Sequence, residues 1–358
     1  MTSLRVEETI KWIKNSEDIC VLFHIDSDGI TSAYLFNKLV EHMGKKVKTF
    51  YASAAASLDK RTYEKAKNHD LVVFLDLSVD GDPEYVKKLS EVSKVVIIDH
   101  HLLHEDLNTK NLIHISTKLL TEDYYPASYF VYNLFKDYVK SFEEYDWIAA
   151  IGLIGDGGAR LNTEFMDGVL KKYNISKGKC ENYTDTHLGY LDLLVGCARM
   201  YSGGRGAMKA LKILLDSGDM KEFEENSLVL KNWYNKVEKE LQSKMRVFER
   251  NAKKSGNLLY YHFSKPKYNI GAALSTNACI KHKDKLVVIT MDVNPRIVKI
   301  HAKSNTSRFN TFEILEKIVP GLKSSTFGGH IPASGGSFDS SELKEFQKRL
   351  FELAKTLK

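Results

Sequence analysis

Histidines and aspartates gather at four places in the first half of the sequence, each beside an apolar run or between glycines. These residues are His24, Asp26, Asp28, Asp76, Asp99, His100, His101 and Asp156. A carboxylate at the end of an apolar strand is costly to desolvate unless a cation or a metal ion pairs with it. None of the short segments that hold these residues (HIDSD, LDLS, IDHH and GDGG) contains an arginine or a lysine. We therefore infer that divalent cations offset the repulsion among the carboxylates.

The donor atoms of this set favour some metals over others. Carboxylates and imidazoles without thiolates favour manganese, with magnesium or cobalt as alternatives and zinc disfavoured. Two such ions, about 3.5–4 Å apart, contact both the attacking and the leaving oxygen of an in-line phosphoryl displacement. They also lower the pKa of water, so that hydroxide is available near neutral pH. The residues thus predict a phosphoester hydrolase that uses two divalent metal ions, Mn²⁺ foremost.

Apolar segments of strand length lead into three of the four places. The expected strands are residues 19–26, 47–53, 71–78 and 94–100, and helices at 29–44 and 59–69 separate the first three. Apolar strands that alternate with helices form a parallel sheet with both faces covered. In such a doubly wound α/β sheet the ligand binds beyond the carboxyl ends of the strands, where these histidines and aspartates stand. His24, Asp26 and Asp28 are each separated by one residue, so an extended segment would point all three side chains to one side.

The rest of the chain predicts a helical region and a second, smaller domain. Residues 127–215 have a mostly helical pattern that is interrupted at 146–158, and a long charged helix covers 219–254. The apolar side of that helix favours a connector over a dimerisation helix. The second domain is expected to be α/β with a mixed sheet. Its strands are expected at 257–263, 285–293 and 297–304, its helices at 269–282, 310–319 and 340–357, and a loop at 326–338.

These patterns predict three parts and a broad class of protein. We expect a catalytic domain over 1–215, a helical connector over 216–256 and a substrate-binding domain over 257–358. The net charge of +6 permits a polyanionic partner without requiring one. The four cysteines are far apart in the sequence, which predicts reduced thiols in a cytoplasmic protein instead of a disulfide framework. Neither a signal-peptide pattern nor an apolar stretch of about 18 residues occurs, so we expect no membrane partner.

Five motifs, in order, resemble those of the DHH phosphoesterase superfamily. HIDSDGITSA (24–33) resembles the first motif, LDLS (75–78) the second, IDHH (98–101) the third and GLIGDGG (152–158) the fourth. GGHIPASGG (328–336) resembles the substrate loop of the DHH-associated C-terminal domain. The superfamily includes RecJ exonucleases, NrnA-type oligoribonucleases, cyclic-dinucleotide phosphodiesterases and family II inorganic pyrophosphatases. The resemblance covers nearly the whole chain and is strongest for archaeal RecJ-like and NrnA-like members.

The resemblance implies a role for each residue of the first four motifs. His24 and Asp26 would hold one metal ion, and Asp28 the other. Asp76 would bridge the two ions. His100 and Asp156 would complete the ligands of the second ion. Asp99 would orient a histidine, and His101 would contact a phosphate or act as general acid for the leaving oxygen.

The resemblance also implies substrate contacts in the second domain. Gly328 and Gly329 would let the backbone approach a phosphate closely, and His330 would contact the scissile or the adjacent phosphate. Lys303 stands where the family usually has an arginine, so two-pronged phosphate binding is not expected there. Phe327 replaces a further glycine of the family pattern, and we interpret it as a packing residue.

The expected activity is exonucleolytic hydrolysis of single-stranded DNA or RNA from one end. The alternative is a phosphoesterase for very short substrates: a nanoRNase that cleaves oligoribonucleotides, or a phosphatase for cyclic dinucleotides or phosphoadenosine phosphate. The sequence also allows a homodimer, or a partner protein from replication or repair. A catalytically silent scaffold is disfavoured, because all four metal motifs are intact. Tyr124 and Tyr125 are interpreted as packing residues and not as platforms for bases.

Overall fold

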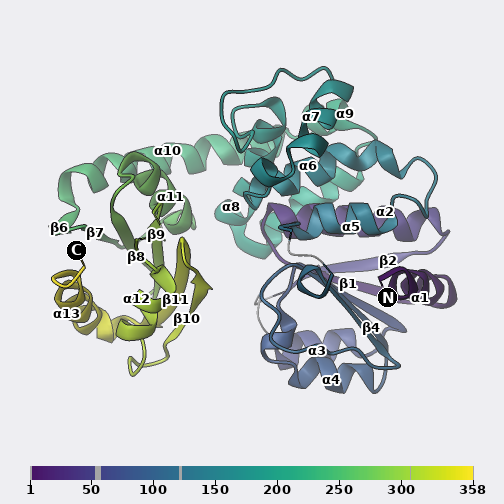
Figure 1. Ribbon diagram of the computed structural model, residues 1–358, viewed down its shortest axis with the longest axis horizontal. Coiled ribbons are helices and arrows are strands. Elements are labelled where there is room, and N and C mark those ends of the chain that lie inside the picture. The colour runs from purple at the N-terminus through teal and green to yellow at the C-terminus, as the bar shows by residue number, and fades with distance from the viewer. Residues whose placement is uncertain (1, 53–57, 121–122, 307, 358) are drawn as a thin grey trace. The chain divides into compact units, whose positions relative to one another are not determined.

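The computed structural model describes residues 2–52, 58–120, 123–306 and 308–357. The chain forms two compact units, Met1–Tyr234 and Asn235–Lys358 (Figure 1). The division falls inside helix α10 (Leu228–Asn251), which lies within the segment predicted as a connector. Each unit has its own sheet and its own hydrophobic core.

The first unit is built on a five-stranded sheet in which all strands are parallel. In spatial order they are β2 (Val47–Tyr51), β1 (Ile19–Phe23), β3 (Leu71–Leu75), β4 (Lys94–Asp99) and β5 (Leu112–Ser116). The chain runs to one side of β1 first and then to the other, which confirms the doubly wound fold. Strand β5 was not predicted, because its five residues include His114 at the centre and give too short an apolar run.

Helices cover both faces of this sheet (Figure 1). Alternate strand residues point to opposite faces: Val21 and Phe23 pack with the larger helical layer, and Cys20 and Leu22 pack with α3 and α4. The helices of this unit are α1 (Thr2–Asn15), α2 (Ser27–His42), α3 (Lys60–Ala66), α4 (Glu84–Ser90), α5 (Ala127–Phe135), α6 (Asp146–Gly155), α7 (Thr163–Lys172), α8 (His187–Leu215) and α9 (Met220–Asn226), with α10 crossing into the second unit.

Two helical segments differ from the predicted pattern. Residues 146–158, predicted as an interruption, contain helix α6. Every residue of α6 from Trp147 to Ile154 is buried, so the helix lacks the polar face by which a sequence reveals one. The predicted helix 219–254 is two helices, α9 and α10, separated at Ser227, whose buried hydroxyl donates to the carbonyl of Phe223.

Gly152 lets α6 pack closely against α2 and α5. A Cβ atom at this position would lie 2.0 Å from the hydroxyl oxygen of Ser128 and 2.5 Å from that of Thr31. We expect Gly152→Ala to lower the free energy of unfolding by about 1–3 kcal/mol, since overpacking a core costs that much. Gly168→Ala on α7 is the matched control, because a Cβ atom there meets nothing within 4 Å. Denaturant unfolding compares the two variants, and equal losses would contradict the tight packing.

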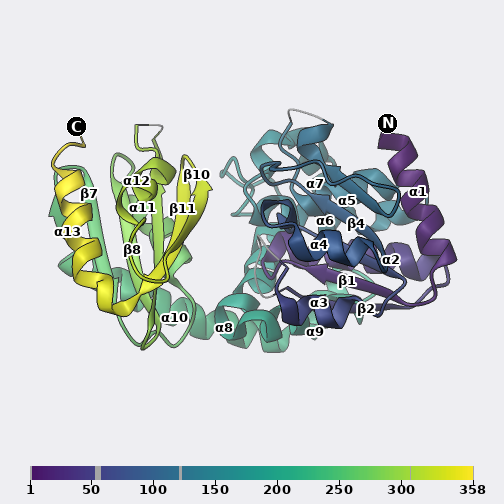
Figure 2. The same ribbon diagram turned by 90° about the horizontal axis from the view of Figure 1, so that it is seen from below.

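The second unit is an α/β unit with a six-stranded mixed sheet, as predicted (Figure 2). Only the β7–β8 pair is parallel among its described strands. Helices α12 and α13 pack on one face, and α11 contacts β8 and β9. The strands in spatial order are β10 (Thr326–His330), β11 (Ala333–Asp339), β9 (Ile297–Ser304), β8 (Leu286–Asn294), β7 (Leu258–Phe263) and β6 (Lys253–Ser255), and the helices are α11 (Gly271–Lys281), α12 (Thr311–Ile318) and α13 (Leu343–Ala354).

The predicted loop 326–338 is wrong, since these residues form the hairpin of β10 and β11. Glycine has a low strand propensity, and four glycines in this stretch conceal the strands in the sequence. None of the helices among the described residues combines the length and the apolar character that a membrane span requires.

Candidate metal centre

The ends of three neighbouring strands bring the predicted residues together. His24 follows β1, Asp76 follows β3, and Asp99 is the last residue of β4. Strand pairing continues just past the strand ends, where the backbone N–H of His24 donates to the Leu75 carbonyl (3.3 Å) and that of Asp76 to the Ile98 carbonyl (3.1 Å). These contacts hold the three strand ends level at the carboxyl edge of the sheet.

Asp28 reaches this edge from a helix and not from an extended segment, which corrects the expected alternation. Asp26 is the N-cap of α2, and its carboxylate accepts from the backbone N–H of Gly29 (3.1 Å). Asp28 lies in the first turn of α2 and is buried. Gly29 permits this tight entry, because a Cβ atom there would lie 2.0 Å from the carbonyl oxygen of His24.

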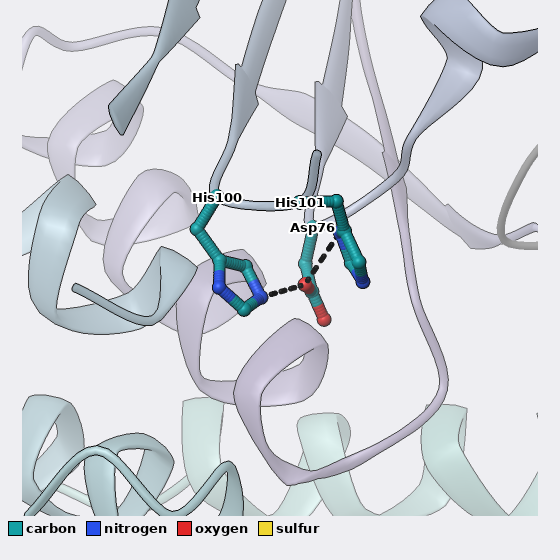
Figure 3. A group of neighbouring side chains, drawn as sticks. All are labelled: Asp76, His100 and His101. Carbon is teal, nitrogen blue, oxygen red and sulfur yellow. Dashed lines mark ion pairs between the residues drawn. The ribbon is translucent and has the colours of Figure 1, made fainter. Parts of the chain in front are cut away.

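The side chains converge within ion-pair distance of one another. Nδ1 of His24 lies 2.9 Å from Asp26 and 3.3 Å from Asp76. Nε2 of His100 lies 3.2 Å from Asp76, 3.8 Å from Asp28 and 3.7 Å from Asp156. Figure 3 shows the rings of His100 and His101 on either side of the Asp76 carboxylate.

Three overlapping groups of donor atoms result, each with its atoms within 4.8 Å of one another. The groups are Asp76, His100 and His101; His24, Asp26 and Asp76; and Asp28, His100 and Asp156. Asp76 belongs to two of them, and so does His100. The predicted metal residues therefore all lie in one place, and oxygen and imidazole donors without thiolates suit a Mn²⁺-type cation.

The carboxylate of Asp28 is fixed by the N-terminus of α5. It accepts hydrogen bonds from the backbone N–H groups of Ala127 (2.6 Å) and Ser128 (2.9 Å) and from the Ser128 hydroxyl (2.5 Å). Free N–H groups and the helix dipole favour a negative charge at this end of a helix. Because α5 lies about a hundred residues after Asp28, nothing in the sequence indicates this contact.

Asp99 contacts His101 at two points. The Nδ1 atom of His101 lies 2.7 Å from the Asp99 carboxylate, and the backbone N–H of His101 donates to the same carboxylate at 3.3 Å. Burial lowers the pKa of His101, but the charge of Asp99 and the hydrogen bond to it outweigh that effect and raise the pKa to about 9. The side chain of His101 is partly exposed, in contrast to that of His100.

Two of the carboxylates, those of Asp28 and Asp156, resist ionisation because they are buried beside other carboxylates. Burial, and after it the charge of Asp76, raises the pKa of Asp28 well above its usual value. Burial also raises the pKa of Asp156. Burial lowers the pKa of His100, but hydrogen bonding to Asp76 and the nearby carboxylates raise it to about 10. An edge that stabilises positive charge in this way fits bound divalent cations.

Metal affinity is expected to rise with pH. Below its pKa of about 10, His100 carries a proton that it must lose before it can bind a metal ion. The raised pKa of Asp28 adds a second competing proton. We expect the apparent Mn²⁺ affinity to increase by up to about tenfold per pH unit for each displaced proton. Calorimetric titration in buffers of different ionisation enthalpy measures the released protons, and metal binding without proton release would contradict this.

Two further side chains, which the sequence did not indicate, contact residues of the centre. The guanidinium of Arg199, on α8, lies 3.8 Å from Asp26. The hydroxyl of Tyr124 donates to the carboxylate of Asp156. Both stand more than thirty residues away in the chain from the carboxylate they contact. Helix α8 is kinked just beyond Arg199, at Ser202 and Gly203, and Gly203 has a φ of +56°.

The predicted substrate residues lie in the second unit. Gly328 and Gly329 are in β10, and Lys303 is in β9, where it pairs with Ala333 of β11. Gly329 has a φ of +130°, and a Cβ atom there would lie 2.6 Å from the Ala333 carbonyl oxygen, so this position requires glycine. His330 ends β10, and its side chain lies outside the described part of the structure. Phe327 packs against Phe312, with ring centroids 5.7 Å apart.

Comparisons with known proteins agree with the motifs and the fold. Residues 18–155 match the sequence model of the DHH family, N-terminal domain. No curated protein sequence matches the chain. Among solved structures, RecJ from Thermus thermophilus in complex with Mn²⁺ superposes with a TM-score of 0.77 at 15% identity, over 100% of this chain and 55% of that chain.

Two other structures match over almost their whole length. An exonuclease RecJ bound to manganese has a TM-score of 0.70 at 17% identity, over 99% of this chain and 93% of that chain. CDC45 from Entamoeba histolytica has a TM-score of 0.62 at 12% identity, over 98% of this chain and 99% of that chain. At such identities the likeness shows a shared fold. The family match covers residues 18–155, whose sequence is similar to the DHH family, N-terminal domain.

Proposed function

We propose that the chain is a phosphodiesterase that depends on two divalent metal ions. The observation that carries this proposal is the overlap of three donor groups through Asp76 and His100, with all donor atoms of a group within 4.8 Å. One fold can carry unrelated functions, so the activity is inferred from the side chains and not from the fold.

The metal residues divide between two positions. His24 and Asp26 would hold one ion, Asp28, His100 and Asp156 the other, and Asp76 would contact both. When bound, the ions polarise the phosphoryl group and lower the pKa of water. Manganese is proposed foremost, since the donor set favours it and RecJ has been crystallised with Mn²⁺, although also with Mg²⁺.

His101 is proposed to act on the leaving oxygen. Its Nδ1 atom is held by Asp99 at 2.7 Å, so Nε2 is the nitrogen that would meet a substrate. The charge of Asp99 favours the protonated ring, which can contact a phosphate or give up a proton. Asp99 thus fixes both the orientation and the charge of His101.

The proposed substrate is single-stranded DNA or RNA, cleaved from one end. The likeness to exonuclease RecJ supports it, as do Lys303 and the glycine-rich hairpin of the second unit, where backbone N–H groups could approach a phosphate. Very short substrates are the alternative, and substrate length separates the two.

The test uses the purified full chain, Mn²⁺ and end-labelled DNA and RNA strands from dinucleotides to twenty-nucleotide oligomers. Stepwise shortening of the long strands supports an exonuclease, and cleavage confined to strands of a few nucleotides supports the alternative. Excess chelator is the control. A chain that binds both short and long strands in Mn²⁺ and leaves all of them intact is not this enzyme.

A further inference from the structure

Tyr124 contacts two residues of the candidate metal centre at once. Its hydroxyl donates to the Asp156 carboxylate, and its oxygen also lies 3.4 Å from the Asp156 carbonyl oxygen. Its ring stands edge-on to the ring of His100, with centroids 5.6 Å apart and an interplanar angle of 76°. Asp156 and His100 belong to the same donor group, together with Asp28. One tyrosine therefore fixes two of the three residues in this group.

The contact matters for Asp156 because the backbone hydrogen bonds of its turn do not orient its side chain. It caps the C-terminus of α6 and is followed by Gly157, which has a φ of +74°. A turn flanked by glycines does not by itself hold a side chain in one orientation. The contact with Tyr124 supplies an anchor from another segment, and the Tyr124 hydroxyl is well suited to donate, because burial and the charge of Asp156 raise its pKa.

Asn162 joins the two segments behind this contact. Its side-chain N–H₂ donates to the carbonyl of Tyr124 (3.0 Å) and to the carbonyl of Gly158 (2.9 Å). The Tyr124 segment and the turn that carries Asp156 are thereby held at a fixed separation. The backbone of Tyr124 is thus held by a hydrogen bond while its hydroxyl contacts Asp156.

We propose that Tyr124 is a positioning residue of the metal centre, which orients Asp156 and the ring of His100 for metal binding. This rests on the proposed metal site, but not on any particular substrate. Partners that hydrogen-bond to metal ligands typically contribute about 10–100-fold in metal affinity or activity. A tyrosine that only packed would leave metal affinity unchanged when its hydroxyl is removed.

The adjacent Tyr125 offers a matched control. Its hydroxyl also donates to a carboxylate, that of Asp123 (3.0 Å), and its ring packs on Tyr129 with centroids 5.3 Å apart. Neither Asp123 nor Tyr129 belongs to a donor group of the metal centre. Tyr124→Phe and Tyr125→Phe therefore make the same chemical change in neighbouring residues, and only the first is expected to affect metal binding.

The experiment measures Mn²⁺ binding to the full chain directly, by calorimetry or by the electron paramagnetic resonance signal of free Mn²⁺. We expect Tyr124→Phe to weaken at least one Mn²⁺ site by about tenfold or more, and Tyr125→Phe to change neither site by more than about twofold. Equal affinities in Tyr124→Phe and the wild type would overturn the proposal. Because binding is measured without turnover, a wild-type chain that binds Mn²⁺ but cleaves nothing contradicts the proposed function alone.

A double-mutant cycle with Asp156→Asn separates positioning from a general loss of stability. Tyr124 orients the carboxylate of Asp156, so Tyr124→Phe should weaken Mn²⁺ binding far less in the Asp156→Asn background than in the wild type. The same fold loss in both backgrounds would show that Tyr124 acts independently of Asp156, and it too would overturn the proposal. If Tyr124→Phe only lowered stability, it would weaken Mn²⁺ binding equally in both backgrounds. The cycle therefore separates loss of stability from loss of positioning.

Discussion

Asp76→Asn is expected to lower the rate of phosphodiester hydrolysis by at least about a thousandfold, since bound metal ions supply several kcal/mol of transition-state stabilisation. Asp76 is the carboxylate shared by two donor groups: it lies 3.2 Å from His100 and 3.3 Å from His24. It is also buried. An asparagine at this position keeps the shape of the side chain and loses the charge that would hold both ions.

The backbone of Asp76 decides which substitution is informative. Its φ of +57° lies in the left-handed region, which asparagine tolerates and alanine does not. Alanine would add a backbone cost of about 1–2 kcal/mol to the loss of the carboxylate. Asp76→Asn should therefore unfold at nearly the temperature of the metal-free wild type.

Asp80→Asn is the matched control for Asp76→Asn. Asp80 is a buried aspartate in the same unit, and it accepts from the backbone N–H groups of His104 (2.6 Å) and Glu105 (3.3 Å). It belongs to no donor group, so its loss should lower stability and leave the rate per folded molecule within about threefold. Hydrolysis by Asp76→Asn at more than a tenth of the wild-type rate would refute the shared role of Asp76.

Removal of divalent metal is expected to abolish activity and to destabilise the first unit. Without cations, burial and, after it, the charge of Asp76 raise the pKa of Asp28, a sign that the folded state disfavours the charged form of this carboxylate. Mn²⁺ at a hundred times its dissociation constant would stabilise the fold by about 2.7 kcal/mol for each site. For a unit of this size that corresponds to an increase of roughly 5–10 °C in melting temperature.

Melting curves with chelator, with Mn²⁺ and with Mg²⁺ measure this effect beside the hydrolysis rate. Wild-type protein should gain both stability and activity on addition of Mn²⁺, and Asp76→Asn should gain much less of either. Full hydrolysis in excess chelator would contradict a metal-dependent mechanism, whatever the melting temperatures are.

The sheet of the first unit could be predicted because its strands are continuous apolar runs. Residues 19–23, 71–75 and 94–99 are buried almost throughout, and a parallel sheet covered on both faces requires such runs. Elements whose sequences lack the hydrophobic periodicity of a helix or a strand were missed. Helix α6 is buried on all sides, and the hairpin β10–β11 is built largely from glycine and serine, so neither has the alternation that marks it in a sequence.

The convergence of His24, Asp76 and His100 could be predicted because these residues follow strands whose ends must meet. The residues that support them could not. Ser128 and Tyr124 reach Asp28 and Asp156 from a segment outside the four motifs, and Arg199 reaches Asp26 from a helix far along the chain. Local sequence also misplaced Asp28: its carboxylate reaches the site from the first turn of α2, because Asp26 caps that helix.

The central claim is that this edge of the sheet holds two metal ions, and crystals soaked in Mn²⁺ test it most directly. Anomalous diffraction at the manganese edge locates each ion without reference to activity. The account predicts two anomalous peaks about 3.5–4 Å apart, with Asp76 between them. A single peak, or two peaks of which neither contacts Asp76, would contradict it.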